Sequence, residues 1–530
     1  MDVSAGKTAL PIEILQEIFQ WTSHQRDPFS RMEAPVILAS VCSWWRSIVF
    51  QTPALWSTIV VTHVVRRRRP MAKHSDDTQQ VEFQRIKFYL KQSRQSTLDI
   101  YVQLTTSNRD KTPNPWTSTP SLRGGPKSSV SDLALTLAPY APRFRRFHVL
   151  STRYSPVKEF LSTFPQVAMP RLEELHIDRV HRLHSQLHSD CPRTCPESLA
   201  FLNIHHITAD DAQDYFHDNF PALKSIALAS IPLLLPVFTP THLTSLKMTL
   251  PQPDVTTEFR NLLMANAHSL EKLSFMATHT LSAFEHRQLT VSASPENLIW
   301  FPVVMKLEIS YADPDTFLPL VSVLRFPSLT SLRITNVQRT ITFPTKQLFE
   351  ALFVSIAVDR IENLNLENVF AGHAPLGATD NTISPSLYSC RILNNLTSLA
   401  TLTITGIDNY ILHFLNSTIS IASALRLPSL THLHLIPTGE EGGLENLVSF
   451  LWERLALMNN SACPPLQELA ITGPPMWMHD LKNIDLRRIA HSVLLLFPTY
   501  PQRSGGIWDD NLPTHSSVDL SVMDENGHSA

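Results

Sequence analysis

The segment "HRLHSQLHSDCPRTC", residues 181–195, carries side chains that could bind a metal ion. His181, His184 and His188 recur at helical spacing and are followed by Cys191 and Cys195. Imidazole nitrogens and thiolates are ligands that Zn²⁺ prefers, so a zinc site is one interpretation. The spacing matches no common zinc module, and a solvated connector in a chain with 23 histidines is the alternative. Both interpretations stay open, and we assign no metal and no cofactor.

A run of four arginines, "RRRRP" at residues 66–70, is the strongest local concentration of charge. Such a run is typical of a nuclear import signal or an anion-binding patch. A solvated loop is the more common role of a short basic run.

Sequence motifs of common enzyme classes are absent. The chain has no Gly-x-Ser-x-Gly elbow, P-loop, Gly-x-Gly-x-x-Gly turn or His-Glu-x-x-His helix. Its 13 glycines are few and its 39 prolines are many, which disfavours phosphate-cradling loops. We predict no catalytic residues and a non-enzymatic role; a hydrolase or transferase hidden in the fold is an alternative.

Bulk composition narrows the class of partner. The net charge of −3 implies no global attraction to nucleic acid or to a membrane surface. No apolar run approaches the ~18 residues that span a bilayer, and residues 1–10 do not look like a secretory signal. The five cysteines are an odd number and sparse, which favours a reducing compartment. We expect a cytoplasmic or nuclear protein that binds neither nucleic acid nor membranes.

A repeated pattern organises most of the chain. Seven segments, among them "PRLEELHI" from Pro170 and "FPSLTSLRI" from Phe326, share the pattern Pro-x-apolar-x-x-apolar-x-apolar. Five more keep the apolar spacing without that proline, so twelve copies start between Phe144 and Leu466. Their mean step of about 29 residues is the spacing of leucine-rich repeats, in which a short strand buries alternate side chains and the chain returns through a helix.

The segments between the copies support this interpretation. Stretches from Asp315, Thr345 and Leu444 carry apolar residues at helical spacing, and proline before a strand ends the preceding helix. One repeat cannot bury its own apolar face, so the copies must stack. We expect an α/β fold: an irregular solenoid with parallel strands on the concave face and helices on the convex face.

Domain boundaries follow from these patterns. "LWSTIVV", ending at Val61, and "LDIYVQL" from Leu98 are read as divergent opening turns of the same stack, with a separate small α/β element as the alternative. We predict an N-terminal helical unit at 9–59, divergent opening repeats or a linker at 60–140, the solenoid at 141–500, and a polar, disordered tail at 501–530.

Two amphipathic helices are expected ahead of the repeats. One covers Leu10 to Trp21, with Pro11 at its first turn, and the other starts at Ala34 and includes Trp44 and Trp45. The loop between them, "TSHQRDPFSRMEA", is long. About 50 residues of short helices hold too little core to stand alone, so apolar surface left on them indicates a partner.

This stretch resembles the F-box, in the motif Leu10-Pro11-x-Glu13-Ile14-Leu15-x-x-Ile18-Phe19 and in Val41-Cys42-x-x-Trp45-Arg46. "TPALWSTI" from Thr52 is similar to the tail found in a large fungal F-box group. The resemblance covers about a tenth of the chain, and it implies a short three-helix F-box. Ordinary core of a capping unit is the alternative role for Trp44, Trp45 and Trp56.

The resemblance implies docking on the Skp adaptor of a Skp–cullin–F-box ubiquitin ligase and, through it, on a cullin scaffold. The residues that would face the adaptor are Leu10, Pro11, Ile14, Leu15, Ile18, Val41, Cys42 and Trp45. Trp56 would instead cover the joint between the F-box and the first repeat.

The expected function is therefore that of a non-catalytic receptor subunit that holds an unknown target protein. In a repeat array, exposed positions beside the buried strand residues make the binding face. Here those positions are Glu174, His176, Asp178, Lys247, Lys272, Lys306, Glu308, Arg333, Asn365 and His434. A leucine-rich-repeat interaction scaffold with no role in ubiquitin transfer is the alternative.

Overall fold

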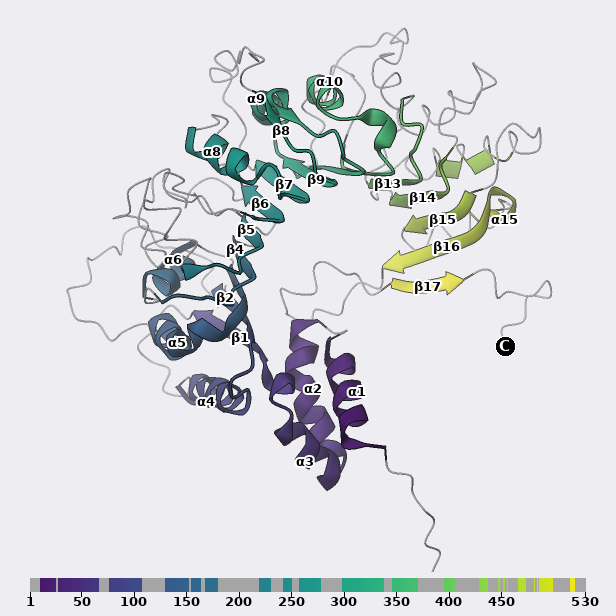
Figure 1. Cartoon of the computed structure of the whole chain (residues 1–530). Coiled ribbons are helices and arrows are strands. Elements are labelled where there is room, and N and C mark those ends of the chain that lie inside the picture. The colour runs from purple at the N-terminus through teal and green to yellow at the C-terminus, as the bar shows by residue number, and fades with distance from the viewer. Residues whose placement is uncertain are drawn as a thin grey trace, which may run out of the picture. The chain divides into compact units, whose positions relative to one another are not determined.

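The computed structural model contains α-helices and β-strands in two compact units (Figure 1). It describes residues 10–24, 27–65, 76–106, 129–151, 154–163, 167–179, 219–229, 242–249, 257–277, 298–337, 346–369, 395–405, 429–436, 447–448, 451–452, 455, 466–472, 481, 484, 486–498 and 515–519. Unit 1 comprises residues 1–251 and 256–266, and unit 2 comprises 252–255 and 267–530.

Unit 1 begins with three helices, α1 (Ile12–His24), α2 (Pro28–Val41) and α3 (Ser43–Gln51), followed by the 3-10 turn η1 (Pro53–Trp56). We call residues 10–57 the head. Asp27 caps α2, because its carboxylate accepts the backbone N–H groups of Phe29 and Ser30, and Pro28 occupies the first turn. The long loop expected at residues 22–34 is therefore wrong: most of it is the first half of α2.

The expected second helix is also interrupted. Cys42 has an extended backbone (φ −159°, ψ 168°), which ends α2 and starts α3. The Cys42 thiol accepts the backbone N–H of Trp45 at 3.4 Å, so it caps α3 at the break. The head thus contains three helices.

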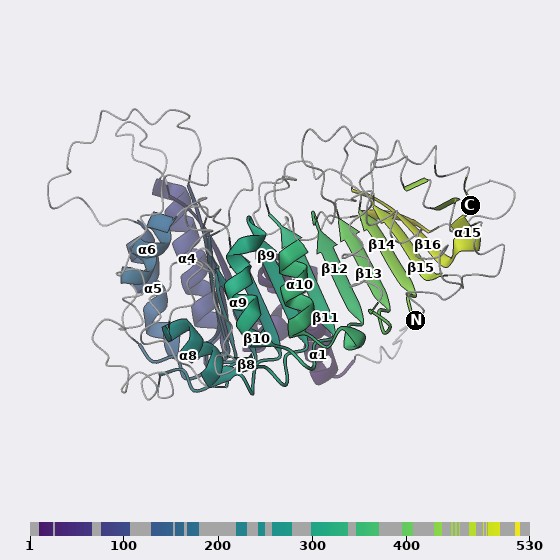
Figure 2. The same ribbon diagram turned by 90° about the horizontal axis from the view of Figure 1, so that it is seen from above.

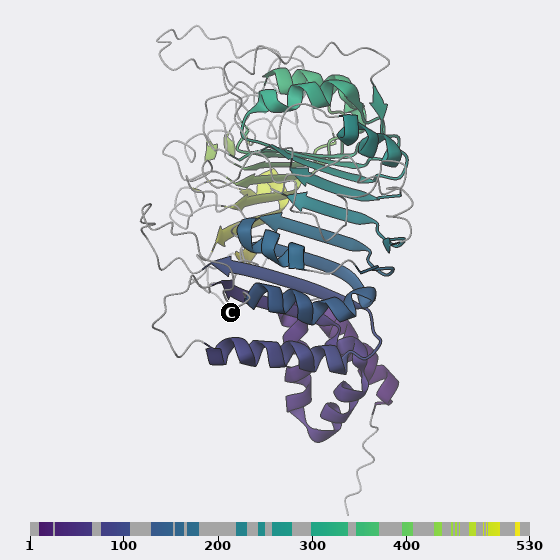
Figure 3. The same ribbon diagram turned by 90° about the vertical axis from the view of Figure 1, so that its left-hand side faces the viewer.

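Six parallel strands of unit 1 follow one another in sequence order: β1 (Thr58–Val65), β2 (Leu98–Thr106), β3 (Phe144–Ser151), β4 (Glu174–Arg179), β5 (Ser225–Ala229) and β6 (Ser245–Thr249). The connecting helices are α4 (Asp76–Gln92), α5 (Ser129–Leu137), α6 (Tyr154–Thr163) and α8 (Thr257–Asn266), with the turn η2 (Ala138–Arg143). Helices α4 and α5 run side by side along one face of the first strands (Figure 3).

Unit 2 repeats this arrangement. Its parallel strands are β7 (Lys272–Ala277), β9 (Lys306–Tyr311), β11 (Ser331–Asn336), β12 (Asn363–Glu367), β13 (Thr401–Thr405), β14 (His432–Ile436), β15 (Leu466–Thr472) and β16 (Ala490–Pro498). Strand β17 (His515–Asp519) pairs with β16 in antiparallel fashion.

Short elements cover one face of unit 2. Helices α9 (Leu318–Val323) and α10 (Lys346–Ser355) lie over its strands (Figure 2). The remaining elements are the turns η8 (Pro314–Phe317) and η9 (Val358–Arg360), the helix α15 (Leu486–Ile489) and the paired strands β8 (Ile299–Trp300) and β10 (Leu324–Arg325).

The repeat pattern matches the strands copy by copy. Eleven of the twelve predicted copies coincide with the strands β3–β7, β9 and β11–β15, and all three keyed apolar residues of each are buried. The keyed residues are also register partners: Leu364 of β12 lies between Leu332 of β11 and Leu402 of β13. The copy at Leu199 lies outside the described residues. The α/β class with sequential parallel strands is therefore confirmed within each unit.

The ends of the array differ in detail from the pattern. Both opening segments are strands: β1 pairs with β2, and β2 pairs with β3. Strand β17 lies inside the predicted disordered tail, whose other residues lie outside the described ranges. Of the expected helical stretches, the one from Leu444 falls mostly outside them too.

Candidate protein-binding surfaces

One exposed apolar stripe runs along α1. Leu10, Ile14 and Ile18 are spaced by one helical turn and are exposed, and Trp21 extends the stripe with 65% of its side chain in solvent. Burial of such residues is the main source of protein–protein affinity, and monomeric proteins seldom leave a stripe of them open. The stripe is a candidate contact surface.

Helices α2 and α3 add further exposed apolar side chains. Val36, Ile37, Val41 and Trp44 are all exposed. Together with Ile12 and the α1 stripe, nine of the seventeen large exposed apolar residues in the described part of the chain lie between residues 10 and 44. We call these nine residues the head patch.

Two residues predicted to face the adaptor are partly or fully covered within the head: Leu15 is buried and Trp45 is half-buried. Leu15 is only 5% exposed, and the Trp45 ring lies 4.8 Å from the ring of Phe19, which is buried. The other predicted residues, Leu10, Pro11, Ile14, Ile18, Val41 and Cys42, are exposed.

Trp56 joins the head to the strands. Its side chain is 1% exposed, and its indole Nε1–H donates to the backbone oxygen of Val49 at 3.0 Å. The ring stacks on Phe50 and meets the edges of Phe88 and Tyr89 on α4. Trp56 is thus buried between the head and α4, as expected both for a residue that covers the joint and for the core of a capping unit.

The head also covers the start of the open strand face, the face opposite α4–α6. Met32 of α2 accepts the backbone N–H of Val60 at its sulfur and the Tyr89 hydroxyl at its carbonyl. Open-face residues of β1 and β2, such as Val60 and Tyr101, are buried, whereas those of β3 to β6 are half-exposed. Burial raises the pKa of the Tyr89 phenol to about 12.

A charge network lies on this face where the head ends. Arg145 donates two hydrogen bonds to the carboxylate of Asp99, at 2.9 and 2.6 Å, and Asp99 is almost fully buried. This contact raises the pKa of the Arg145 guanidinium. Arg146 approaches Glu174 at 3.1 Å, so the predicted binding residue Glu174 is already partnered.

Two histidines continue the network. The His148 and His176 rings lie 5.1 Å apart, and their Nε2 atoms stand 3.6 Å from Glu174 and Asp178, respectively. Burial lowers the pKa of His148, while the neighbouring His148 imidazole lowers the pKa of Glu174. The predicted residues Glu174, His176 and Asp178 are thus brought together, and Lys247 lies two strands from β4 along the same face.

The open face of unit 2 is mostly uncharged. Strand β13 presents Thr401, Thr403 and Thr405, whose neighbours across the sheet include Asn365 and His434. His434 Nε2 and the Thr472 hydroxyl are 2.9 Å apart, and Arg333 pairs with Glu367 at 2.9 Å. The predicted residues Lys272, Lys306, Glu308, Arg333, Asn365 and His434 all lie on this face.

No three histidine, cysteine or acidic residues converge as a metal site in the described part of the chain. The candidate zinc segment 181–195 and the arginine run at 66–70 both lie outside that part. Within the described ranges, no helix has the length and apolar character needed to cross a lipid bilayer.

The chain matches no known family model, and no curated protein resembles it significantly in sequence.

Several head-patch residues were missed by the sequence reasoning. Trp21 follows Ile18 by three residues, so helical spacing alone could have added it to the stripe. Val36, Ile37 and Trp44 could not be placed, because the break at Cys42 shifts which side of each helix faces the core.

Proposed function

We propose that this chain is a substrate-receptor subunit of a Skp–cullin–F-box ubiquitin ligase. The head would dock the Skp adaptor and, through it, the cullin scaffold, while an irregular leucine-rich-repeat solenoid would hold the target protein. The single observation that carries the proposal is the head patch, where apolar side chains gather on three short helices.

The resemblance to the F-box and the exposure of the head support each other. Motif residues Ile14 and Ile18 of α1, and Leu10 just before it, lie in solvent although they are large and apolar. Burying a side chain of this size contributes about 1.5–3 kcal/mol, so the three residues could supply a large part of the energy of a docking contact. A stripe at this spacing suits a partner that offers an apolar groove.

The receptor itself would supply no catalytic group. Its contribution would be proximity, because a target held on the strands raises the effective concentration of a target lysine near the charged conjugating enzyme. Open strand faces in both units, with their polar side chains, support the role of binding a protein ligand.

An interaction scaffold with no ubiquitin role is the second candidate, and one observation favours it. Helix α2 covers the first strands at Val60, as a capping element does. A cap alone does not require the outward stripe of Leu10, Ile14 and Ile18, so the receptor function remains our proposal.

The test is adaptor binding by the full chain. We expect the wild-type protein to co-purify with a Skp adaptor, and the variant Ile14→Glu/Ile18→Glu to bind about a hundredfold more weakly, since two apolar contacts are lost. Trp45→Ala is unsuitable because Trp45 packs on Phe19 and its loss would unfold the head.

Val354→Glu is the matched control, because Val354 is an exposed apolar residue of α10, outside the head. It should bind the adaptor like the wild type. Absence of wild-type binding, or equal binding by the head variant and the wild type, would overturn the receptor function and leave the interaction scaffold with no ubiquitin role as the remaining candidate.

A further inference from the structure

Two lysines face each other on the open face of unit 2. Lys272 begins β7 and Lys306 begins β9, and the two residues are register partners on adjacent parallel strands. Both side chains are exposed, while the following residues, Leu273 and Leu307, are buried. Neighbouring strands lie about 4.8 Å apart, and like charges directly opposite each other destabilise a sheet.

Neither lysine makes an ion pair among the described residues. Two carboxylates of the open face make other contacts: Ser274 donates to Glu308 at 3.3 Å, and Arg333 and Thr335 donate to Glu367. Within the described ranges, the sheet therefore holds two adjacent lysines that form no ion pair.

Hydrogen-bond donors continue the same row. In register with Lys306 lie Ser331, Asn363, Thr401 and His432 on the next four strands, and the first carboxylate of the row is Glu468 on β15. We call these residues, from Lys272 to His432, the donor row. An anionic ligand laid across the strands would meet no like charge along it.

Exposed apolar side chains precede Lys306 in the sequence. Trp300, Val303 and Met305, in the strand β8 and the turn that leads into β9, are all exposed. Inorganic phosphate or another small anion would leave these side chains in water. A peptide that carries both acidic and apolar residues would cover them.

We propose that the donor row binds an acidic segment of the target protein, with carboxylate or phosphate groups against Lys272 and Lys306 and a large apolar residue beside Met305. This inference deepens the proposed function, since it names the chemistry of the target that the receptor would hold. Recognition of the target would then depend on the positive charge of Lys272 and Lys306.

The experiment measures binding of labelled short peptides to the full chain by fluorescence anisotropy. The probes are a peptide of alternating Leu and Glu, the same peptide with phosphoserine for Glu, and the same peptide with Gln for Glu. We expect the Glu or phosphoserine probe to bind and the Gln probe not to bind. The tighter of the two anionic probes identifies whether the target is acidic or phosphorylated.

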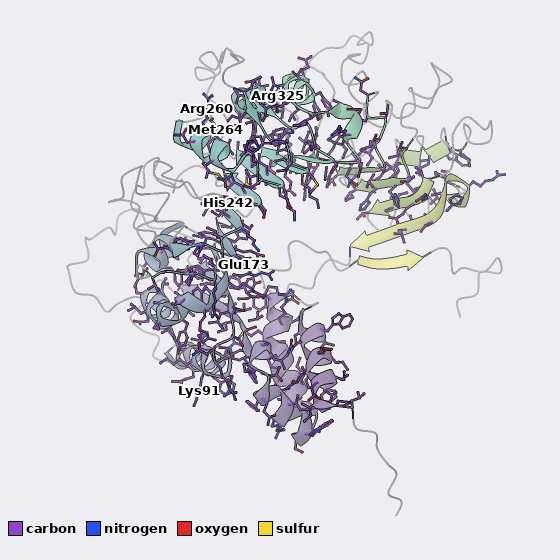
Figure 4. All side chains as sticks on the ribbon, in the orientation of Figure 1. Lys91, Glu173, His242, Arg260, Met264 and Arg325 are labelled. Carbon is purple, nitrogen blue, oxygen red and sulfur yellow. The ribbon has the colours of Figure 1, made fainter. Side chains whose placement is uncertain are left out.

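The variant Lys272→Gln/Lys306→Gln should weaken anionic-probe binding at least about fivefold, because each lysine contributes a partly exposed ion pair. Lys91→Gln is the matched control and should change nothing, since Lys91 is an exposed lysine on α4, away from the strand face (Figure 4). Both lysines of the pair are exposed, so their replacement leaves the core intact.

Equal affinity for the Gln probe, no binding of either anionic probe, or equal binding by the double variant and the wild type would each overturn the inference. These outcomes leave adaptor docking untouched, because the head patch and the donor row lie in different units. Loss of adaptor binding with retained acidic-peptide binding would overturn the ubiquitin role alone.

Discussion

The indole Nε1–H of Trp56 donates to the backbone oxygen of Val49, the residue seven positions earlier, at 3.0 Å. This bond ties the end of α3 to the turn that enters β1, and the same ring packs against Phe88 and Tyr89 of α4. The head and the first strands therefore share one aromatic core.

Replacing Trp56 should destabilise the head and the first strands together. Trp56→Ala is expected to lower the free energy of unfolding of unit 1 by about 3–5 kcal/mol, the usual cost of a buried aromatic cavity. Trp56→Phe should cost less, because it keeps most of the ring and loses mainly the bond to Val49. Chemical denaturation followed by circular dichroism measures both, and a Trp56→Ala protein as stable as the wild type would contradict the shared core.

The Asp99–Arg145 pair should behave as a buried charge with a half-exposed partner. Asp99→Asn is expected to destabilise unit 1 by up to about 3 kcal/mol, since it removes the charge that receives both Arg145 bonds. The double variant Asp99→Asn/Arg145→Gln should cost less than the two single changes combined. Additive costs in a double-mutant cycle would show that the two residues are not coupled.

The two faces of a strand should respond differently to substitution. Leu364 of β12 is buried between Leu332 and Leu402, so Leu364→Ala should destabilise unit 2 by about 2–5 kcal/mol. The next residue, Asn365, lies on the open face, and Asn365→Ala should cost less than about 1 kcal/mol. Thermal unfolding of the two variants provides the comparison, and similar losses would contradict the strand orientation.

Acid should weaken unit 1 through His148. Burial lowers the pKa of the folded imidazole, so the unfolded chain binds a proton more readily, and stability falls as the pH drops below about 6.5. The facing groups are Tyr101, Arg146, Glu174 and His176. Glu174, whose pKa is also lowered, adds a further loss at lower pH.

Denaturant titrations between pH 5 and pH 8 check this prediction, with His148→Phe as the variant that cannot titrate. Its stability should change less with pH than that of the wild type above the range where carboxylates titrate. Parallel pH profiles for the two proteins would rule out His148 as the source.

The strand array was predictable because its signal is periodic and repeated. The keyed residues of β9, Val304, Leu307 and Ile309, are all buried, as the spacing indicated. Strand β16 was missed because alanine, Ala490, takes the first keyed position, in register with Leu466 of β15. A pattern restricted to large apolar residues could not include it.

The opening strands show how tertiary contacts adjust a repeat. In β2, a register shift between Leu98 and Asp99 brings Leu98 opposite Phe144, so a spacing one residue short still fills the core. Sequence spacing alone does not reveal such a shift. In β1, Trp56 precedes Ile59 and Val61 at the repeat spacing, and all three are buried.

The head was predicted in outline and not in detail. The apolar spacing of α1 identified the helix, but Leu15 and Ile18 could not be assigned to its inner and outer sides before the packing of Phe19 against Trp45 was known. The start of α2 could have been read from Asp27-Pro28, since an aspartate cap before proline is a helix-start signal.

Trp56 packs both in the helical head and at the start of the strand array. This packing determines which fragments of the chain can fold. A fragment that ends at residue 60 would lack Phe88 and Tyr89, so the Trp56 indole would be exposed to solvent and the fragment would be prone to aggregate. The smallest fragment that folds on its own should therefore extend through α4 and β2, so the head and the first strands form one folding unit.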